Sequence, residues 1–337
     1  MTLVNTSNSP DVASDHNFPS FFRPDCSVYE SGCAHNELLD SALVDFFIEF
    51  KTASDDDPFS SEPGNNGEDD WNALMSTKSG ACKTAGQITA YAAMLLGAQY
   101  RTHTFSILIF KDYARLLRWD RGGAVVTAPV YYNSESYLFD FLIRYDNASK
   151  EIRGHDLTVR PASKVEAQTA LMFLGPDPVA PLILITIQHP SSDQTSHYIV
   201  SSPRARSAIP AGRWTRTSIA YDVQRNKRVL LKDSRRMLLD DVPPEGVVYA
   251  KLHENSVPNV PHCSLAVDIG NEKYHKSQTD RFAGKYSCNP SVGRFTSHRH
   301  YRLVLDTIGE RLEEFRSSQA LVKGIYASLQ GRLAKCW

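Results

Sequence analysis

Two acidic residues and a lysine in the first half of the sequence have the types and spacing of a metal-dependent catalytic site. Pro24-Asp25 opens one expected strand, and Glu49 and Lys51 lie two residues apart on a later strand, so their side chains share a face. Gln87 and Tyr91 follow one turn apart on an expected helix. Two carboxylates from adjacent strands can hold Mg²⁺, and a lysine beside them can position or activate a water. The alternative is that Asp25 caps a turn and that Glu49 and Lys51 form a surface ion pair.

A second set of residues, in the other half, has the order of a nucleotide-binding site. Lys232 ends the expected strand 228–232, and Glu245 begins a helix 13 residues later. Protein kinases use a strand lysine, held by a helix glutamate, to contact the α- and β-phosphates of ATP. A lone strand lysine is otherwise a solvated edge residue. The order predicts that Lys232 and Glu245 form an ATP phosphate-facing pair, with nitrogen and oxygen about 4 Å apart or less.

The first set resembles the motifs of the PD-(D/E)xK nucleases over roughly residues 20–130, because P-D, E-x-K and Q-x-x-x-Y occur in that order. The resemblance implies a restriction-endonuclease-like domain, with a mixed sheet and flanking helices, in which Asp25 and Glu49 hold Mg²⁺. Nucleases of this type often carry another acid on a helix before the P-D strand. Residues 1–23 offer only Asp11 and Asp15, so the fold can persist without the activity.

Longer stretches of the chain resemble the fungal-type protein kinase family. The segment R-W-D-R-G-G-A, at Arg118–Ala124, is the most specific of them. The other matching stretches are Gly86–Ile88, Tyr91–Ala93, Arg101–Ser106, Ala114–Leu117, Glu151–Asp156, Ile219–Asp222, Leu231–Asp233, Pro244–Gly246 and His300–Val304. The resemblance implies an ATP-dependent Ser/Thr kinase fold, with an N-lobe-like antiparallel sheet and one helix, preceded by a family-specific N-terminal domain.

The kinase resemblance ends before the catalytic loop. A kinase needs an H-R-D-type loop and a D-F-G-type aspartate after its hinge strand, but only 28 residues follow Gly309, which closes the expected hinge. His298–His300 and Asp268–Gly270 resemble the two motifs by eye, yet both precede the hinge strand 301–305. We therefore expect a truncated family member, a pseudokinase or fragment, without catalytic residues for phosphoryl transfer and inactive as a kinase.

Three functions of different classes stay open at this stage. The first is a kinase-family protein that keeps the nucleotide-facing half and uses ATP as ligand. The second is a Mg²⁺-dependent nuclease in the N-terminal domain, with nucleic acid as substrate. The third is a non-enzymatic interaction module, whose protein partner the residues do not identify.

Composition sets the protein class. The chain has 337 residues and a net charge of −1. Its hydrophobic content of 42% is enough to build packed cores. No apolar run approaches the ~20 residues that span a bilayer, and the N-terminus lacks the pattern of a secretory signal. Six cysteines without a C-x-x-C pair suit a reducing compartment. We expect a soluble protein of the cytoplasm or nucleus, with no membrane partner.

Charge is unevenly distributed along the chain. Residues 52–77 contain seven acids and no lysine or arginine, whereas 201–236 contains ten basic residues against two acids. A basic stretch can attract phosphates or nucleic acid. A solvated loop with exposed strand faces accounts for it equally well.

The predicted organisation is α+β, in two domains. Residues 1–20 are expected to be a disordered arm, 21–153 an N-terminal α+β domain, 154–180 a bridging segment, and 181–337 a partial kinase-like domain. Apolar periodicity predicts helices at 87–100, 137–147, 243–252 and 317–333. Strands are predicted at 26–29, 42–51, 104–110, 113–119, 124–128, 182–188, 197–201, 218–223, 228–232 and 301–305.

Overall fold

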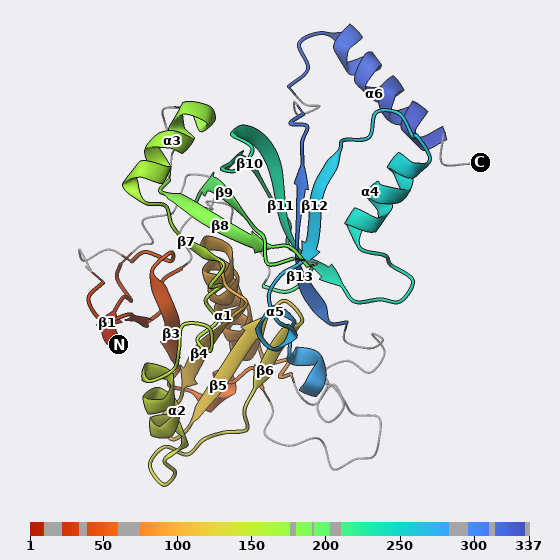
Figure 1. The fold of residues 1–337 in the computed structure, drawn as a ribbon. Helices are drawn as coiled ribbons and strands as arrows, with labels where there is room; N and C mark the ends of the chain where they lie inside the picture. Colours follow the sequence, from red (N-terminus) through yellow and green to blue (C-terminus); the bar gives the residue numbers. More distant parts are fainter. Residues whose placement is uncertain are drawn as a thin grey trace. The chain divides into compact units, whose positions relative to one another are not determined.

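The structure is a computed structural model of the whole chain (Figure 1). It describes residues 1–9, 22–33, 39–59, 75–175, 180–190, 192–202, 210–282, 296–309 and 314–333. The chain divides into two compact units, each built from separate stretches. The first unit is Met1–Leu157, Pro203–Trp214 and Asn271–His298, and the second is Thr158–Ser202, Thr215–Gly270 and Arg299–Trp337. None of the helices in the described part is long and apolar enough to cross a membrane.

The first unit contains a mixed six-stranded sheet whose strands follow sequence order. The strands are β1 (Thr2–Asn5), β2 (Cys26–Tyr29), β3 (Val44–Phe50), β4 (His103–Ile109), β5 (Ala114–Asp120) and β6 (Gly123–Val126). All neighbours are antiparallel except β3 and β4, which are parallel. A parallel pair needs a crossover, and α1 (Ser79–Ala98) lies within the connection between these two strands.

Helices lie on both faces of this sheet. The helix α1 contributes Ile88, Tyr91 and Leu95 to a core cluster with Phe47 of β3. A second cluster joins Phe46 of the same strand to side chains of α2 (Tyr137–Asp146). Because β3 is covered on both sides, every residue from Val44 to Glu49 is buried. This burial explains the nearly continuous apolar sequence of the strand.

The N-terminus of the first unit differs from the prediction. Residues 2–5 form β1, which pairs with Cys26–Tyr29, so the expected disordered arm is wrong for them. A four-residue strand is too short for its periodicity to be recognised, and backbone pairing to β2 stabilises it. The remainder of the arm, from residue 10 to 20, lies outside the described residues.

The R-W-D-R-G-G-A segment holds two later stretches of the chain within the first unit. Asp120, at the end of β5, accepts hydrogen bonds from the Gln278 backbone N–H at 2.7 Å and the Thr279 hydroxyl at 2.7 Å. Arg121 donates to the Pro210 carbonyl at 2.8 Å, and its guanidinium lies 4.1 Å from the Trp214 ring centroid. Two segments of the second half, Pro203–Trp214 and Asn271–His298, therefore belong to the first unit. The predicted domains were contiguous stretches of sequence, so the prediction did not include this.

Replacing Asp120 is expected to release residues 271–282. Asp120 is 1% exposed, and an asparagine would keep its size but lose the charge that strengthens these hydrogen bonds. We expect the Gln278 amide, which donates to Asp120, to exchange at least about tenfold faster in Asp120→Asn, as for loss of a charge-assisted bond. Hydrogen exchange with mass spectrometry measures this. Asp112→Asn, in an exposed turn, is the control, and unchanged exchange in Asp120→Asn would refute the assignment.

The second unit contains a seven-stranded antiparallel sheet in the order β12-β13-β11-β10-β9-β8-β7. Its strands are β7 (Val159–Pro161), β8 (Leu182–Gln188), β9 (Thr195–Ser201), β10 (Arg216–Asp222), β11 (Lys227–Met237), β12 (Cys263–Asp268) and β13 (His298–Leu305). Its helices are α3 (Lys164–Leu174), α4 (Glu245–Glu254) and α6 (Ser318–Leu333). The helix α4 lies in sequence between β11 and β12 and contacts β12.

Three features of the second unit differ from the prediction. The segment 154–180 is not a simple bridge, because it contains β7 and α3, and α3 begins with a capping box between Ser163 and Glu166. The second unit has three helices, of which α4 and α6 correspond to the helices predicted at 243–252 and 317–333, whereas α3 was not predicted. The edge strand β12 was not predicted, since only one of its six residues is buried and its apolar pattern is correspondingly weak. The broad α+β class is confirmed.

Candidate functional site

The first unit brings all five predicted nuclease-like residues together. Asp25 immediately precedes β2, Glu49 is the penultimate residue of β3, and Lys51 follows that strand. The helix α1 carries Gln87 and Tyr91 to the same place. The antiparallel pairing of β2 with β3 aligns the start of one strand with the end of the other. The expectation that these side chains cluster is therefore confirmed.

Three of the side chains form a closed hydrogen-bonded triangle. Glu49 Oε1 accepts from Lys51 Nζ at 2.8 Å and from Gln87 Nε2 at 2.7 Å. Lys51 Nζ also donates to Gln87 Oε1 at 2.9 Å. The alternative of a solvated surface ion pair is wrong, because the Glu49 side chain is only 4% exposed and the Lys51 side chain 20% exposed.

The remaining two residues attach this triangle to the backbone. The Tyr91 hydroxyl accepts from Gln87 Nε2 at 2.9 Å and donates to the Arg23 carbonyl at 3.0 Å. Asp25 Oδ2 accepts from the Phe50 backbone N–H at 2.8 Å, and the Asp25 N–H lies 3.4 Å from Glu49 Oε2. These bonds fix the rotamers of the cluster before any ligand arrives, as an active site requires.

Burial makes this cluster electrostatically receptive to a cation. Burial raises the pKa of Glu49, the hydrogen bond and charge of Lys51 lower it, and the Asp25 charge raises it again, with a net rise. Burial also raises the pKa of Cys26, and the charges of Asp25 and Glu49 add to that rise. A divalent cation would relieve the repulsion between the two carboxylates, and carboxylate oxygens are the ligands Mg²⁺ prefers. The donor set therefore fits a magnesium ion.

The additional acid seen in many such nucleases cannot be placed here. Its two sequence candidates, Asp11 and Asp15, lie outside the described residues. Both residues that were predicted to hold the metal ion, Asp25 and Glu49, lie among the described residues.

The second unit confirms the predicted contact between Lys232 and Glu245. Lys232 lies on β11, and Glu245 is the first residue of α4. Lys232 Nζ donates to both Glu245 carboxylate oxygens, at 2.8 and 2.6 Å. The two side chains are 24% and 30% exposed, so the ammonium is aimed by its partner yet within reach of a ligand.

The residue after Lys232, Asp233, lies on the opposite face of the sheet, because successive side chains of a strand alternate between faces. Its carboxylate connects β11 to β13. Asp233 accepts from Arg302 Nε at 2.7 Å and lies 3.0 Å from His300 Nε2. Burial lowers the pKa of His300 to about 3, so its neutral ring can donate one hydrogen to this carboxylate. Burial alone would raise the pKa of Asp233, but His300 and Arg302 hold it well below its usual range. This buried cluster fixes the strand that carries Lys232.

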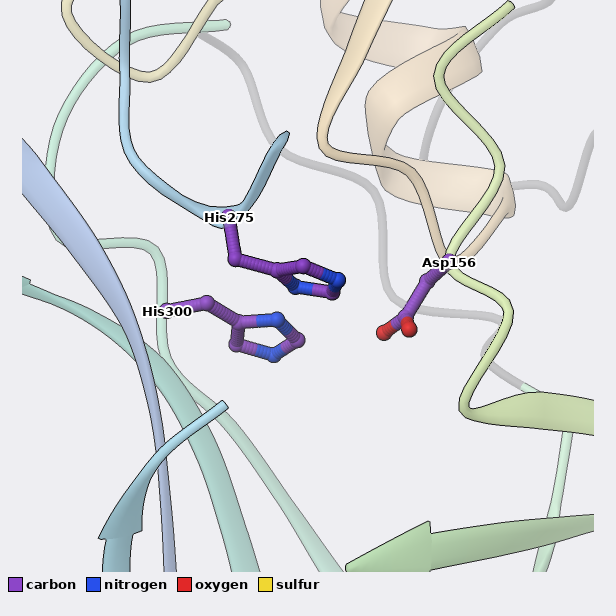
Figure 2. Close-up of side chains that lie close together, drawn as sticks. All are labelled: Asp156, His275 and His300. Atoms are coloured by element: carbon purple, nitrogen blue, oxygen red, sulfur yellow. The ribbon is translucent and has the colours of Figure 1, made fainter. Parts of the chain in front are cut away.

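Sequence reasoning missed two further titratable side chains of the first unit, Asp156 and His275 (Figure 2). Each is buried and offers one potential metal-ligand atom, and these atoms lie within 4.8 Å of each other. His300, also drawn in Figure 2, belongs to the second unit. Two ligands are fewer than a protein zinc site uses. No short-spaced motif connects Asp156 and His275, because they are far apart in sequence.

Comparisons with known proteins do not place the chain in a family. No protein-family model matches the chain, and neither the curated proteins nor the solved structures include a match. The two resemblances therefore rest on the motifs in the sequence and stay hypotheses.

Proposed function

We propose that the second unit is a nucleotide-binding unit of the protein-kinase type, in which Lys232 contacts the phosphates of ATP and Glu245 orients Lys232. The observation that carries this proposal is the contact of one ammonium with both oxygens of one carboxylate, at 2.8 and 2.6 Å. The supporting arrangement is a lysine on a strand, a glutamate on the helix that follows, and two further strands, β12 and β13. Kinases position their phosphate-binding lysine in this way.

The charge and exposure of the pair suit a phosphate ligand. Among the described residues Lys232 Nζ donates only to Glu245, and because an ammonium has three donors, a further hydrogen remains for an anion. The resemblance to the fungal-type protein kinases supplies ATP as the ligand class. We propose binding alone, because the contact of Lys232 with Glu245 bears on phosphate binding, whereas phosphoryl transfer also needs a catalytic aspartate and metal-binding residues.

An acyl-phosphate derivative of ATP, which transfers its acyl group to a lysine beside the bound phosphates, tests nucleotide binding directly. We expect Lys232 to be acylated and excess ATP to prevent the reaction. Glu245→Gln should lower labelling of Lys232 roughly tenfold, the equivalent of about 1.4 kcal/mol of lost orientation. Peptide mass spectrometry identifies the modified lysine.

The matched control is Lys251, an exposed lysine on the same helix. Its acylation is expected to be slow, insensitive to ATP and unchanged in Glu245→Gln. Labelling of Lys232 at the rate of Lys251, or labelling that ATP does not suppress, would rule out the proposed nucleotide site.

We propose a second candidate function, Mg²⁺-dependent cleavage of DNA by the first unit. The specific observation in its favour is the partly buried triangle of Glu49, Lys51 and Gln87, with Asp25 beside it. Asp25 and Glu49 would hold the ion, which supplies Lewis acidity and an activated water when bound. Lys51 lies where it can orient that water or stabilise a phosphate oxygen. Gln87 and Tyr91 keep Glu49 and Lys51 in place.

Plasmid and linear DNA incubated with the full chain test this second function. Cleavage should occur with Mg²⁺ and stop with a chelator, and Ca²⁺ should support it poorly because Ca²⁺ takes more ligands at longer distances. DNA that stays intact at all Mg²⁺ concentrations would leave the first unit as a binding module.

A further inference from the structure

We propose that Tyr301 is a positioning residue for the Lys232–Glu245 pair: its hydroxyl accepts the Gly246 N–H and holds the first turn of α4 where Glu245 reaches Lys232. This inference rests on the proposed nucleotide-binding function, in which Glu245 orients Lys232 toward the phosphates. The hydrogen bond measures 2.9 Å and joins β13 to the helix. Glu245 is the residue immediately before Gly246, so the bond acts on the backbone that carries the carboxylate.

The start of α4 needs this partner. The first N–H groups of a helix have no acceptor within the helix, and a side chain at the N-cap often supplies one. Here the N-cap residue is Pro244, whose side chain makes no such bond. The Tyr301 hydroxyl, on β13, supplies this acceptor. The bond therefore also fixes the position of the first turn of α4 relative to β13.

Close approach of the helix to the sheet depends on glycine at position 246. A Cβ atom there would lie 2.3 Å from the Ala266 Cβ on β12 and 2.7 Å from the Tyr301 hydroxyl. Real Cβ atoms do not tolerate such distances, so any larger residue must displace the helix or the sheet. Gly246 and Tyr301 therefore impose one position on the first turn of α4.

Tyr301 is itself held firmly. It is 4% exposed, and its ring packs with Leu303 and with Tyr249 of α4. The Arg236 guanidinium lies 5.9 Å from its ring centroid, and Arg236 makes two 2.7 Å bonds to Asp268 on β12. Burial raises the pKa of Tyr301, so its hydroxyl stays protonated and uncharged beside Glu245. A fixed hydroxyl on a buried strand is a stable reference point for the helix.

Lysine acylation by acetic anhydride, without nucleotide, tests this role. In Tyr301→Phe the Glu245 carboxylate should hold Lys232 for less of the time, and Lys232 should be acylated roughly fivefold faster, as for the loss of one helix cap. Exposed Lys251, on the same helix, is the internal reference for each sample. Tyr249→Phe is the matched control, because no hydrogen bond to its hydroxyl is found among the described residues; it should leave Lys232 unchanged.

Two further variants separate positioning from general loosening. Gly246→Ala keeps the Tyr301 hydroxyl but forces the helix away, so it should also raise Lys232 acylation. Adding Tyr301→Phe to Glu245→Gln should cause no further rise, because the tyrosine acts through the glutamate. An unchanged Lys232 rate in Tyr301→Phe, an equal rise in Tyr249→Phe, or an additive double variant would each overturn the proposal. If Tyr301→Phe unfolds the unit, its far-UV circular dichroism is lost, and Gly246→Ala then decides.

Failure of nucleotide binding is distinguishable from failure of this inference. If ATP does not protect Lys232 but Tyr301→Phe still accelerates its acylation, the proposed function fails and the positioning role stands. If ATP protects Lys232 and Tyr301→Phe changes nothing, the positioning role alone is overturned.

Discussion

Glu49→Gln is expected to reduce Mg²⁺-dependent DNA cleavage by the full chain at least about 100-fold, the scale of losing one electrostatic contact in a catalytic site. Glutamine preserves the size of the side chain and can still hydrogen-bond to its neighbours. It removes the negative charge, which Mg²⁺ needs and which Lys51 contacts at 2.8 Å. Because Glu49 is buried, no solvent-exposed carboxylate can replace it. The initial rate of plasmid cleavage at saturating Mg²⁺ measures the effect.

Asp55→Asn provides the matched control for charge. Asp55 is an exposed acid of the same unit that pairs with Lys78 at 2.5 Å, and its loss should leave cleavage within about twofold of the unmodified chain, since exposed pairs contribute little. Equal cleavage by Glu49→Gln and the unmodified chain would show that any nuclease activity arises elsewhere. Circular dichroism of both variants verifies that the fold is retained.

Asp233→Asn is expected to destabilise the second unit by about 3–5 kcal/mol, the usual cost of removing one partner from a buried ion pair. Arg302 is 0% exposed and donates its Nε–H to Asp233 at 2.7 Å. Without the carboxylate charge, the guanidinium stays buried and is not neutralised by this neighbour. The pKa of Asp233 is held well below its usual range, so its contribution is fully present above the unfolded pKa, near 4, and is lost only as the pH falls through the folded value.

Hydrogen exchange measures this effect within one unit, because a two-unit chain need not unfold in one step. The free energy of opening of the amides in 298–305 should fall at pH 7 in Asp233→Asn. Asp240→Asn, at an exposed position after β11, should change it by less than about 0.5 kcal/mol. A loss below about 1 kcal/mol for Asp233→Asn would contradict a role for this carboxylate as the anchor of β11 and β13.

Local pattern predicted most regular elements of this protein. The apolar run Leu182–Gln188 forms β8 with the predicted bounds, and the helix predicted at 317–333 is α6. The strands predicted at 218–223 and 228–232 correspond to β10 and β11, which pair antiparallel across a turn in which Asn226 has a positive φ of 50°. Such features depend on neighbours within a few residues, which sequence periodicity records directly.

For each candidate site, the sequence predicted the residues but only some of the contacts between them. E-x-K spacing places Glu49 and Lys51 on one face, and helical spacing places Gln87 near Tyr91. The contact of Gln87 with Lys51 is different, since it needs α1 to return beside β3 in the crossover to a parallel strand. Likewise, the pairing of Lys232 with Glu245 was expected from order alone, but its support by Tyr301 was not. That support joins residues 55 positions apart in sequence.

Other properties were decided only by tertiary structure. The helix α1 begins at Ser79, well before its apolar pattern, because Ala81 and Thr84 are buried against the rest of the unit. Asp120 joins residues more than 150 positions away to the first unit, so its domain is discontinuous. Sequence periodicity reports which face of an element is apolar, whereas the partner of a buried charge depends on where distant strands meet. The buried polar contacts, and the unit boundaries they create, therefore follow from the fold.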